Sequence, residues 1–99
     1  MIYISGKMTG VKDYNYLKFN AVARNLRAKG HKVCNPAEIE IDTTAMPETQ
    51  IWQSCMDIYI SKLDFCDTIY MLKGWEKSRG AKTELKHAID VGLVIELET

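Results

Sequence analysis

The sequence has few of the residues that mark several protein classes. Its 99 residues include two prolines, two histidines and three cysteines, and 13 basic side chains balance 13 acidic ones. This neutral balance gives no electrostatic reason to expect a nucleic-acid or membrane surface as partner. No CxxC pair occurs, and His31 and His87 are isolated, so the usual spacing of zinc ligands is missing. We therefore expect neither a metal nor another cofactor.

Long hydrophobic runs are also missing. The apolar start of "MIYISGKMTG" is far too short for a secretory signal, and no later run approaches the roughly 18 residues of a membrane span. The cysteines, Cys34, Cys55 and Cys66, are odd in number and have apolar neighbours, so we expect reduced, largely buried thiols. These absences predict a cytoplasmic protein.

Strand-like and helix-like patterns alternate along the chain. Short β-prone runs predict strands at residues 2–5, 31–34, 67–72 and 93–97, and apolar residues at helical spacing predict helices over residues 13–29, 49–63 and 79–91. This alternation predicts one α/β domain over residues 1–99: a small Rossmann-like or flavodoxin-like three-layer sandwich. We expect a parallel sheet of about four strands in the order 2-1-3-4. Residues 35–50, which contain both prolines, predict a long surface loop, and loops of this length more often carry a function than merely connect two elements.

In such a sheet a ligand binds beyond the carboxyl ends of the strands, here between the first and third. The loops "SGKMTG" and "KGWEKSRG" would meet at that point. In the first loop Ser5, Gly6, Lys7 and Thr9 are candidates for contacting a polar or anionic ligand, the alternative being an ordinary exposed turn. A P-loop is excluded, because Met8 stands where that motif needs Ser or Thr.

The second loop and the helix after it carry further candidates. Trp75 could stack on a base or cover the core. Ser78 would cap the helix or, with Gly80 beside it, hold a phosphate or sugar hydroxyl. Glu84 lies one turn into the helix at the border of its buried face, where we expect the helix N-terminus to favour the ionised form that a nucleophile needs. The alternative for Glu84 is a surface residue that only compensates the helix dipole.

Three segments together resemble the nucleoside 2-deoxyribosyltransferase superfamily. They are "YISGKMTG", "LRAKGHKVCNPAEI" and "CDTIYMLKGWEKSRGAKTELKHAIDVGL", and they cover nearly the whole chain. Within the superfamily the sequence looks most similar to a small branch found in phages and bacteria, related to the deoxynucleotide N-hydrolases. The resemblance implies a small-molecule nucleoside or nucleotide as substrate and a homo-oligomer, most simply a homodimer.

The resemblance also implies roles for particular residues. Glu84 would attack the anomeric carbon of a deoxyribosyl group and form a covalent glycosyl-enzyme, as in a retaining glycosidase. Tyr3, which could otherwise be simple core packing, would orient Glu84, and Ser78 would contact a 5′-phosphate. Lys7 stands where the hydrolases have a serine, and Thr9 where they have a basic residue. The implied activity is cleavage of an N-glycosidic bond, by a hydrolase or a deoxyribosyltransferase.

One position departs from the family pattern. Family members commonly carry an Asp eight residues before the position of Asp67, where this chain has Tyr59. Asp57 is nearby, but two residues along a helix correspond to a rotation of roughly 200°, so it would point elsewhere. This departure motivates an alternative, a non-catalytic nucleotide sensor or sponge that uses the same cleft. A third interpretation is an interaction subunit whose loop over residues 35–50 contacts a partner protein.

Overall fold

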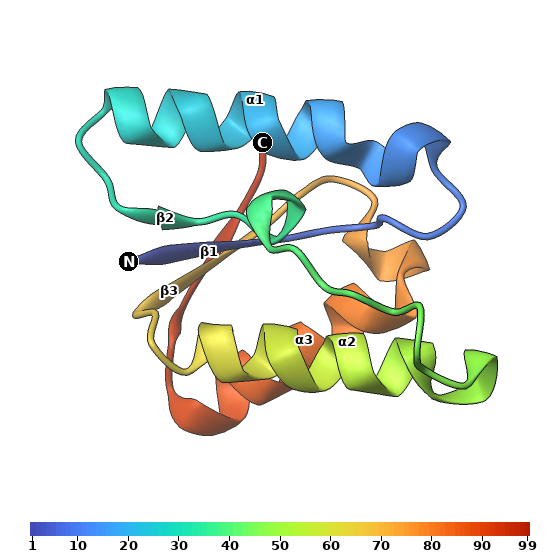
Figure 1. The fold of residues 1–99 in the computed structure, drawn as a ribbon. Helices are drawn as coiled ribbons and strands as arrows, with labels where there is room; N and C mark the ends of the chain where they lie inside the picture. The colour runs from blue at the N-terminus through green and yellow to red at the C-terminus, as the bar shows by residue number, and fades with distance from the viewer.

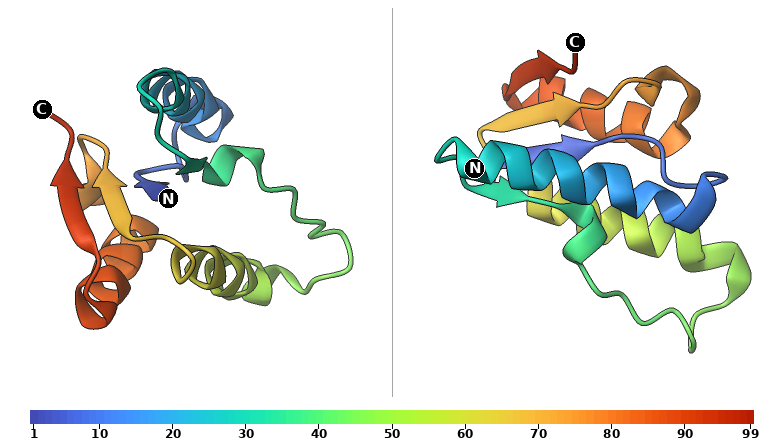
Figure 2. Two further views of the ribbon diagram at one scale, coloured as in Figure 1. Left: turned by 90° about the vertical axis from the view of Figure 1, so that its left-hand side faces the viewer. Right: turned by 90° about the horizontal axis from the view of Figure 1, so that it is seen from above.

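The computed structural model describes all residues from Met1 to Thr99. The elements are β1 (Ile2–Ser5), α1 (Tyr16–Ala28), β2 (Val33–Cys34), α2 (Glu48–Leu63), β3 (Thr68–Met71), α3 (Arg79–Val91) and β4 (Val94–Leu97). All strand pairs are parallel, and the sheet order is β2-β1-β3-β4, as the sequence predicts. Helix α1 covers one face of the sheet, and α2 and α3 cover the other (Figures 1 and 2). No helix is both long enough and apolar enough to cross a membrane.

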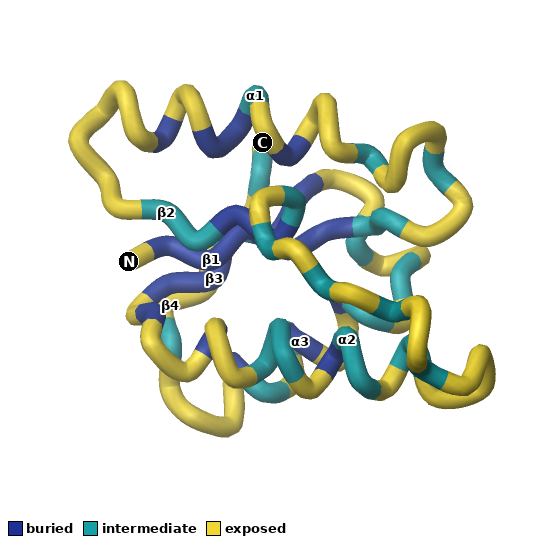
Figure 3. The backbone as a smooth tube through the Cα atoms, in the orientation of Figure 1, coloured by how far each residue is buried: buried dark blue, intermediate teal, exposed yellow.

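The centre of the sheet is the most buried part of the molecule. Every residue of β1 is buried (Figure 3). Successive side chains of a strand point to opposite faces of the sheet. Ile2 and Ile4 pack with Phe19 beneath α1, whereas Tyr3 belongs to the apolar cluster on the α2 and α3 side. Because residues of one parity share a face, β1 presents Tyr3 and Ser5 together toward α3.

The first helix begins later than its apolar spacing predicts. The expected start at residue 13 lies instead in a 3₁₀ turn, Lys12–Asn15, and α1 begins at Tyr16. Asp13, Tyr14 and Asn15 all have positive φ, between 51° and 63°, and this left-handed backbone cannot continue into a right-handed helix. Hydrophobic spacing could not show this break, because it depends on backbone conformation.

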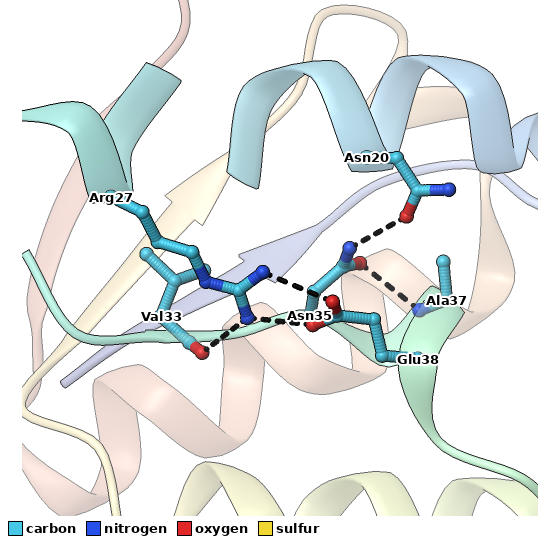
Figure 4. A network of polar contacts seen from close by, with 6 residues as sticks. All are labelled: Asn20, Arg27, Val33, Asn35, Ala37 and Glu38. Atoms are coloured by element: carbon cyan, nitrogen blue, oxygen red, sulfur yellow. Dashed lines mark hydrogen bonds and ion pairs between the residues drawn. The ribbon is translucent and has the colours of Figure 1, made fainter. Parts of the chain in front are cut away.

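The loop after β2 is tied to α1 by a polar network (Figure 4). The buried Asn35 side chain accepts a hydrogen bond from the Ala37 N–H at 3.0 Å and donates one to Asn20 Oδ1 at 2.9 Å. The Arg27 guanidinium donates to both carboxylate oxygens of Glu38, at 3.0 and 2.6 Å. These contacts fix the beginning of the loop, and residues 39–47 then run without regular structure to α2.

The inward stripe of α2 is only partly buried. The sequence predicts Ile51, Cys55, Ile58, Tyr59 and Leu63 as inward residues, but only Leu63 is fully buried, and Met56 is buried as well. The reason is that the first turns of α2 line a cavity rather than the core. A stripe of apolar residues does not distinguish these two surroundings.

The cysteines form no disulfide, and their burial is uneven. Cys66 is buried, whereas Cys34 and Cys55 are partly exposed, so the expectation of largely buried thiols fails for those two. Cys34 ends a two-residue strand at the edge of the sheet, and Cys55 lies on the cavity side of α2. Burial raises the pKa of the Cys66 thiol to about 11.

Candidate functional site

A cavity of about 840 Å³ lies beyond the carboxyl end of β1. The loop after β1 and the first turns of α1 form part of its wall, together with residues 36–43, the first three turns of α2 and the start of α3. This is the side of the sheet on which the sequence places the ligand. About half of the lining residues are apolar, a composition suited to a ligand with both apolar and polar parts.

Glu84 is the one buried carboxylate in the protein, with 5% of its surface exposed, and it lines the cavity. The Tyr3 hydroxyl donates a hydrogen bond to Glu84 Oε2, and Ser5 Oγ donates to Oε1 at 2.7 Å. Both donors come from the face of β1 that points toward α3. The carboxylate is therefore held by a central strand, with a hydrogen bond on each oxygen. This burial excludes a role for Glu84 as a solvated surface residue.

Burial raises the pKa of Glu84 to about 7, while the hydrogen bonds from Tyr3 and Ser5 oppose the rise. The expectation that the helix N-terminus favours the ionised form is not met, because loss of hydration outweighs it. Burial also raises the pKa of Tyr3, with the neighbouring Glu84 adding to the effect, so Tyr3 remains a hydrogen-bond donor. Near neutral pH Glu84 exists in both protonation states, and the ionised one can act as a nucleophile.

The start of α3 forms a polar wall of the cavity. Ser78 caps the helix as the sequence predicts, its Oγ accepting the Ala81 N–H at 3.1 Å. The first turn of a helix leaves backbone N–H groups without partners inside the helix. After Ser78 has capped the Ala81 N–H, the N–H groups of Arg79 and Gly80 are still without a partner. Both residues line the cavity, and so do Lys7, Lys77 and Ser78. This wall can accept an anionic group such as a phosphate.

The loop after β1 approaches the core so closely that it requires glycine. A Cβ atom at Gly6 would lie 2.9 Å from Leu72 Cβ, which is closer than such atoms approach. Gly6, Lys7 and Thr9, three of the residues predicted to contact a ligand, line the cavity. Ser5 was also predicted to contact the ligand, but it is fully buried, and its hydroxyl donates a hydrogen bond to Glu84 instead.

Trp75 lies away from the cavity that the sequence assigns to it. Its side chain packs, partly buried, against the apolar cluster of Tyr3, Ile69 and Met71. The tryptophan that lines the cavity is Trp52 on α2, with the Arg79 guanidinium 3.8 Å from the centre of its ring. The only sequence signal for Trp52 was its position on the same helical face as the inward stripe.

The remaining wall carries aromatic side chains that the sequence analysis did not assign. Tyr16 and Phe19 of α1 and Tyr59 of α2 line the cavity with Trp52. Aromatic faces of this kind can stack on a nucleobase. No group of three His, Cys, Asp or Glu side chains is placed to hold a metal ion.

Fold and site together define a small parallel α/β domain with a buried carboxylate, held by two hydroxyl donors, in a cavity that is aromatic on one side and cationic on another. The chain belongs to the family described as "Domain of unknown function (DUF4406)", whose model matches residues 1–97. Searches of curated proteins and of solved structures found no match.

Proposed function

We propose that the protein cleaves the N-glycosidic bond of a nucleoside or nucleotide through a covalent glycosyl-Glu84 intermediate. The observation that carries the proposal is the single buried carboxylate in the cavity, oriented by Tyr3 and Ser5. A fixed carboxylate that can reach an anomeric carbon is what a retaining glycosyl-transfer mechanism needs. The resemblance to the nucleoside 2-deoxyribosyltransferase superfamily assigns the same role to Glu84.

The surroundings of Glu84 fit a nucleotide. The unpaired N–H groups of Arg79 and Gly80 lie four to five residues before Glu84, which is about 6–8 Å along the helix axis. This span is comparable to that of the few bonds between a 5′-phosphate and the anomeric carbon of a sugar. A phosphate at the start of α3 would thus place the sugar beside Glu84, with the aromatic wall left for the base.

Cleavage follows in two steps. Glu84 attacks the anomeric carbon, the carbon–nitrogen bond breaks, and its electron pair leaves with the base. Water, or the nitrogen of a second base, then attacks the anomeric carbon and restores the Glu84 carboxylate. Water as acceptor makes the protein a hydrolase, and a second base makes it a deoxyribosyltransferase.

A nucleotide sensor or sponge would use the same cavity without cleavage. The observation in its favour is the raised pKa of Glu84, since a protonated carboxyl group cannot attack. The two functions are distinguished by the free base, which an enzyme releases from the nucleotide and a sensor does not.

The test is incubation of the protein with each of the four deoxynucleoside 5′-monophosphates, with free base measured by chromatography. We expect base release from at least one of them. A 2′-fluoroarabinosyl analogue, whose fluorine slows the second step, should add the mass of its sugar phosphate to the peptide that contains Glu84. Binding of nucleotides without base release or labelling would favour the sensor and overturn the proposal.

A further inference from the structure

A second, smaller pocket lies between helix α1 and the turn that follows β2. Its volume is about 310 Å³, near the lower end of the range for small-molecule sites. Only polar side chains line it: Asn20, Arg24, Arg27, Asn35 and Glu38. Because no apolar or aromatic side chain faces this pocket, it suits a small hydrophilic molecule and offers no surface for a nucleobase.

One short segment separates this polar pocket from the cavity around Glu84. The segment consists of Asn35, the 3₁₀ turn Pro36–Glu38 and Ile39. Pro36 and Ile39 line the cavity, whereas Asn35 and Glu38 line the polar pocket, and no residue lines both. The polar pocket is therefore a separate candidate site, which the proposed mechanism does not use.

Most polar groups of this pocket hold one another in place (Figure 4). Asn35, which is only 2% exposed, donates to Asn20 Oδ1, so the NH₂ group of Asn20 is left free. The Arg27 guanidinium is fixed by both carboxylate oxygens of Glu38 and by the Val33 carbonyl oxygen at 3.2 Å. The hydrogen bonds from Arg27 lower the pKa of Glu38, so its carboxylate stays ionised near neutral pH. A ligand would meet donors and acceptors that are already oriented.

Arg24 is the charged group of this pocket that has no partner. It lies four residues after Asn20 and three before Arg27, so the three side chains share one face of α1. All five ion pairs of the protein involve other residues, and Arg24 takes no part in the hydrogen bonds of the pocket. Because Arg27 and Glu38 balance each other, the charge of Arg24 is uncompensated. Its planar guanidinium can donate two parallel hydrogen bonds to an oxyanion.

We propose that this pocket binds a small phosphorylated polyol, such as a sugar phosphate, independently of the cavity. Arg24 holds the phosphate, and the free NH₂ group of Asn20 is a second donor to it. The Glu38 carboxylate has lone pairs that Arg27 does not use, and these accept hydrogen bonds from hydroxyl groups of the ligand. The same carboxylate repels an anion that has no hydroxyl group to offer. The pocket thus selects for a phosphate and hydroxyl groups on one molecule.

The test is a titration of the isotope-labelled protein with glycerol 3-phosphate, sulfate and glycerol, followed by NMR residue by residue. We expect glycerol 3-phosphate to cause saturating shifts at Asn20 and Asn35. Sulfate should bind at least about tenfold more weakly, and glycerol should cause no shift. Arg24→Ala should weaken the binding of glycerol 3-phosphate by about tenfold or more. Lys29→Ala, which removes an exposed charge at the end of the same helix but outside the pocket, should leave it unchanged.

The position of the shifts distinguishes the two sites. Shifts confined to Gly80, Ala81 and their neighbours would place the probe in the cavity and overturn the second site. Shifts that do not saturate, or an equal loss in both variants, would mean non-specific attraction by charge and would also overturn it. Sulfate that binds as tightly as glycerol 3-phosphate would overturn the polyol as ligand. None of these outcomes depends on base release, so the proposed function is tested separately.

Discussion

The protonation of Glu84 links the chemistry of the site to the stability of the fold. Its pKa is about 7 in the folded protein and 4.5 in an exposed carboxyl group, so the folded state binds the proton more tightly. The resulting stabilisation is present below pH 4.5, declines as the pH rises to 7, and is lost above that. At about 1.4 kcal/mol per pKa unit the change is on the order of 3 kcal/mol.

We predict that Glu84→Gln abolishes base release and removes this pH dependence. The amide is nearly isosteric but carries no charge, so it cannot attack a sugar and does not ionise. Between pH 5 and pH 8 the natural protein should lose more free energy of unfolding than the variant does, measured by urea denaturation. At pH 8 the variant should be at least as stable. A variant that retains full turnover would show that the nucleophile is another residue.

Ser5 acts on the same carboxylate from the buried side, and its removal should shift the pH profile. In Ser5→Ala, Glu84 Oε1 loses its 2.7 Å donor, and the pKa of Glu84 rises further. Activity that needs the ionised form should then appear at higher pH and fall about tenfold at pH 7. Ser61→Ala, which removes an exposed hydroxyl on α2, is the control and should leave the profile unchanged. An unshifted profile for Ser5→Ala would contradict this role.

At the scale of elements, the loop after β2 depends on one buried amide. Asn35→Ala removes the acceptor for the Ala37 N–H and the link to Asn20, and should cost about 1–3 kcal/mol of unfolding free energy. Residues 36–43 form one wall of the cavity, so we also expect weaker nucleotide binding by calorimetry. Asn25→Ala makes the same chemical change at an exposed position of α1 and should cost little. Similar losses in both variants would mean that the network contributes no stability.

The elements also show what the sequence can and cannot reveal. The β-prone runs and the helical spacing of apolar residues predicted all four strands and three helices, and the alternation of strand and helix led to the sheet order. The motif around Ser78 and Glu84 led to the carboxylate and its helix cap. Trp52 and Arg79 were missed as a pair, because their contact joins two helices and depends on packing. Tyr59 was predicted as an inward residue and as a departure from the family pattern, but not as part of a cavity wall, since an apolar stripe looks the same whether it faces a core or a cavity.

At the scale of the whole molecule, apolar residues gather on the outer edge of the sheet. Val94, Ile95 and Leu97 of the edge strand β4 are exposed at 37–58%, and Ile89 and Val91 at the end of α3 at 60% and 51%. An apolar edge strand of this kind readily pairs with another. We expect a homodimer, with a mass by light scattering near twice the 11.3 kDa of one chain. Ile95→Lys should shift the mass toward the monomer. A natural protein that is monomeric at high micromolar concentration would contradict this expectation.

The hydrogen bonds from Tyr3 and Ser5 to Glu84 span 81 and 79 residues of the chain. Contacts of such high sequence separation are among the last that a polypeptide can make, because they require closure of almost the entire loop between its ends. β1 also needs β3 as a neighbour before it becomes a central strand. During refolding from denaturant, helical circular dichroism should therefore return before turnover does. Under the proposed function, turnover would report completed folding, because a chain that still lacks α3 at the ribosome has the loop after β1 but not Glu84.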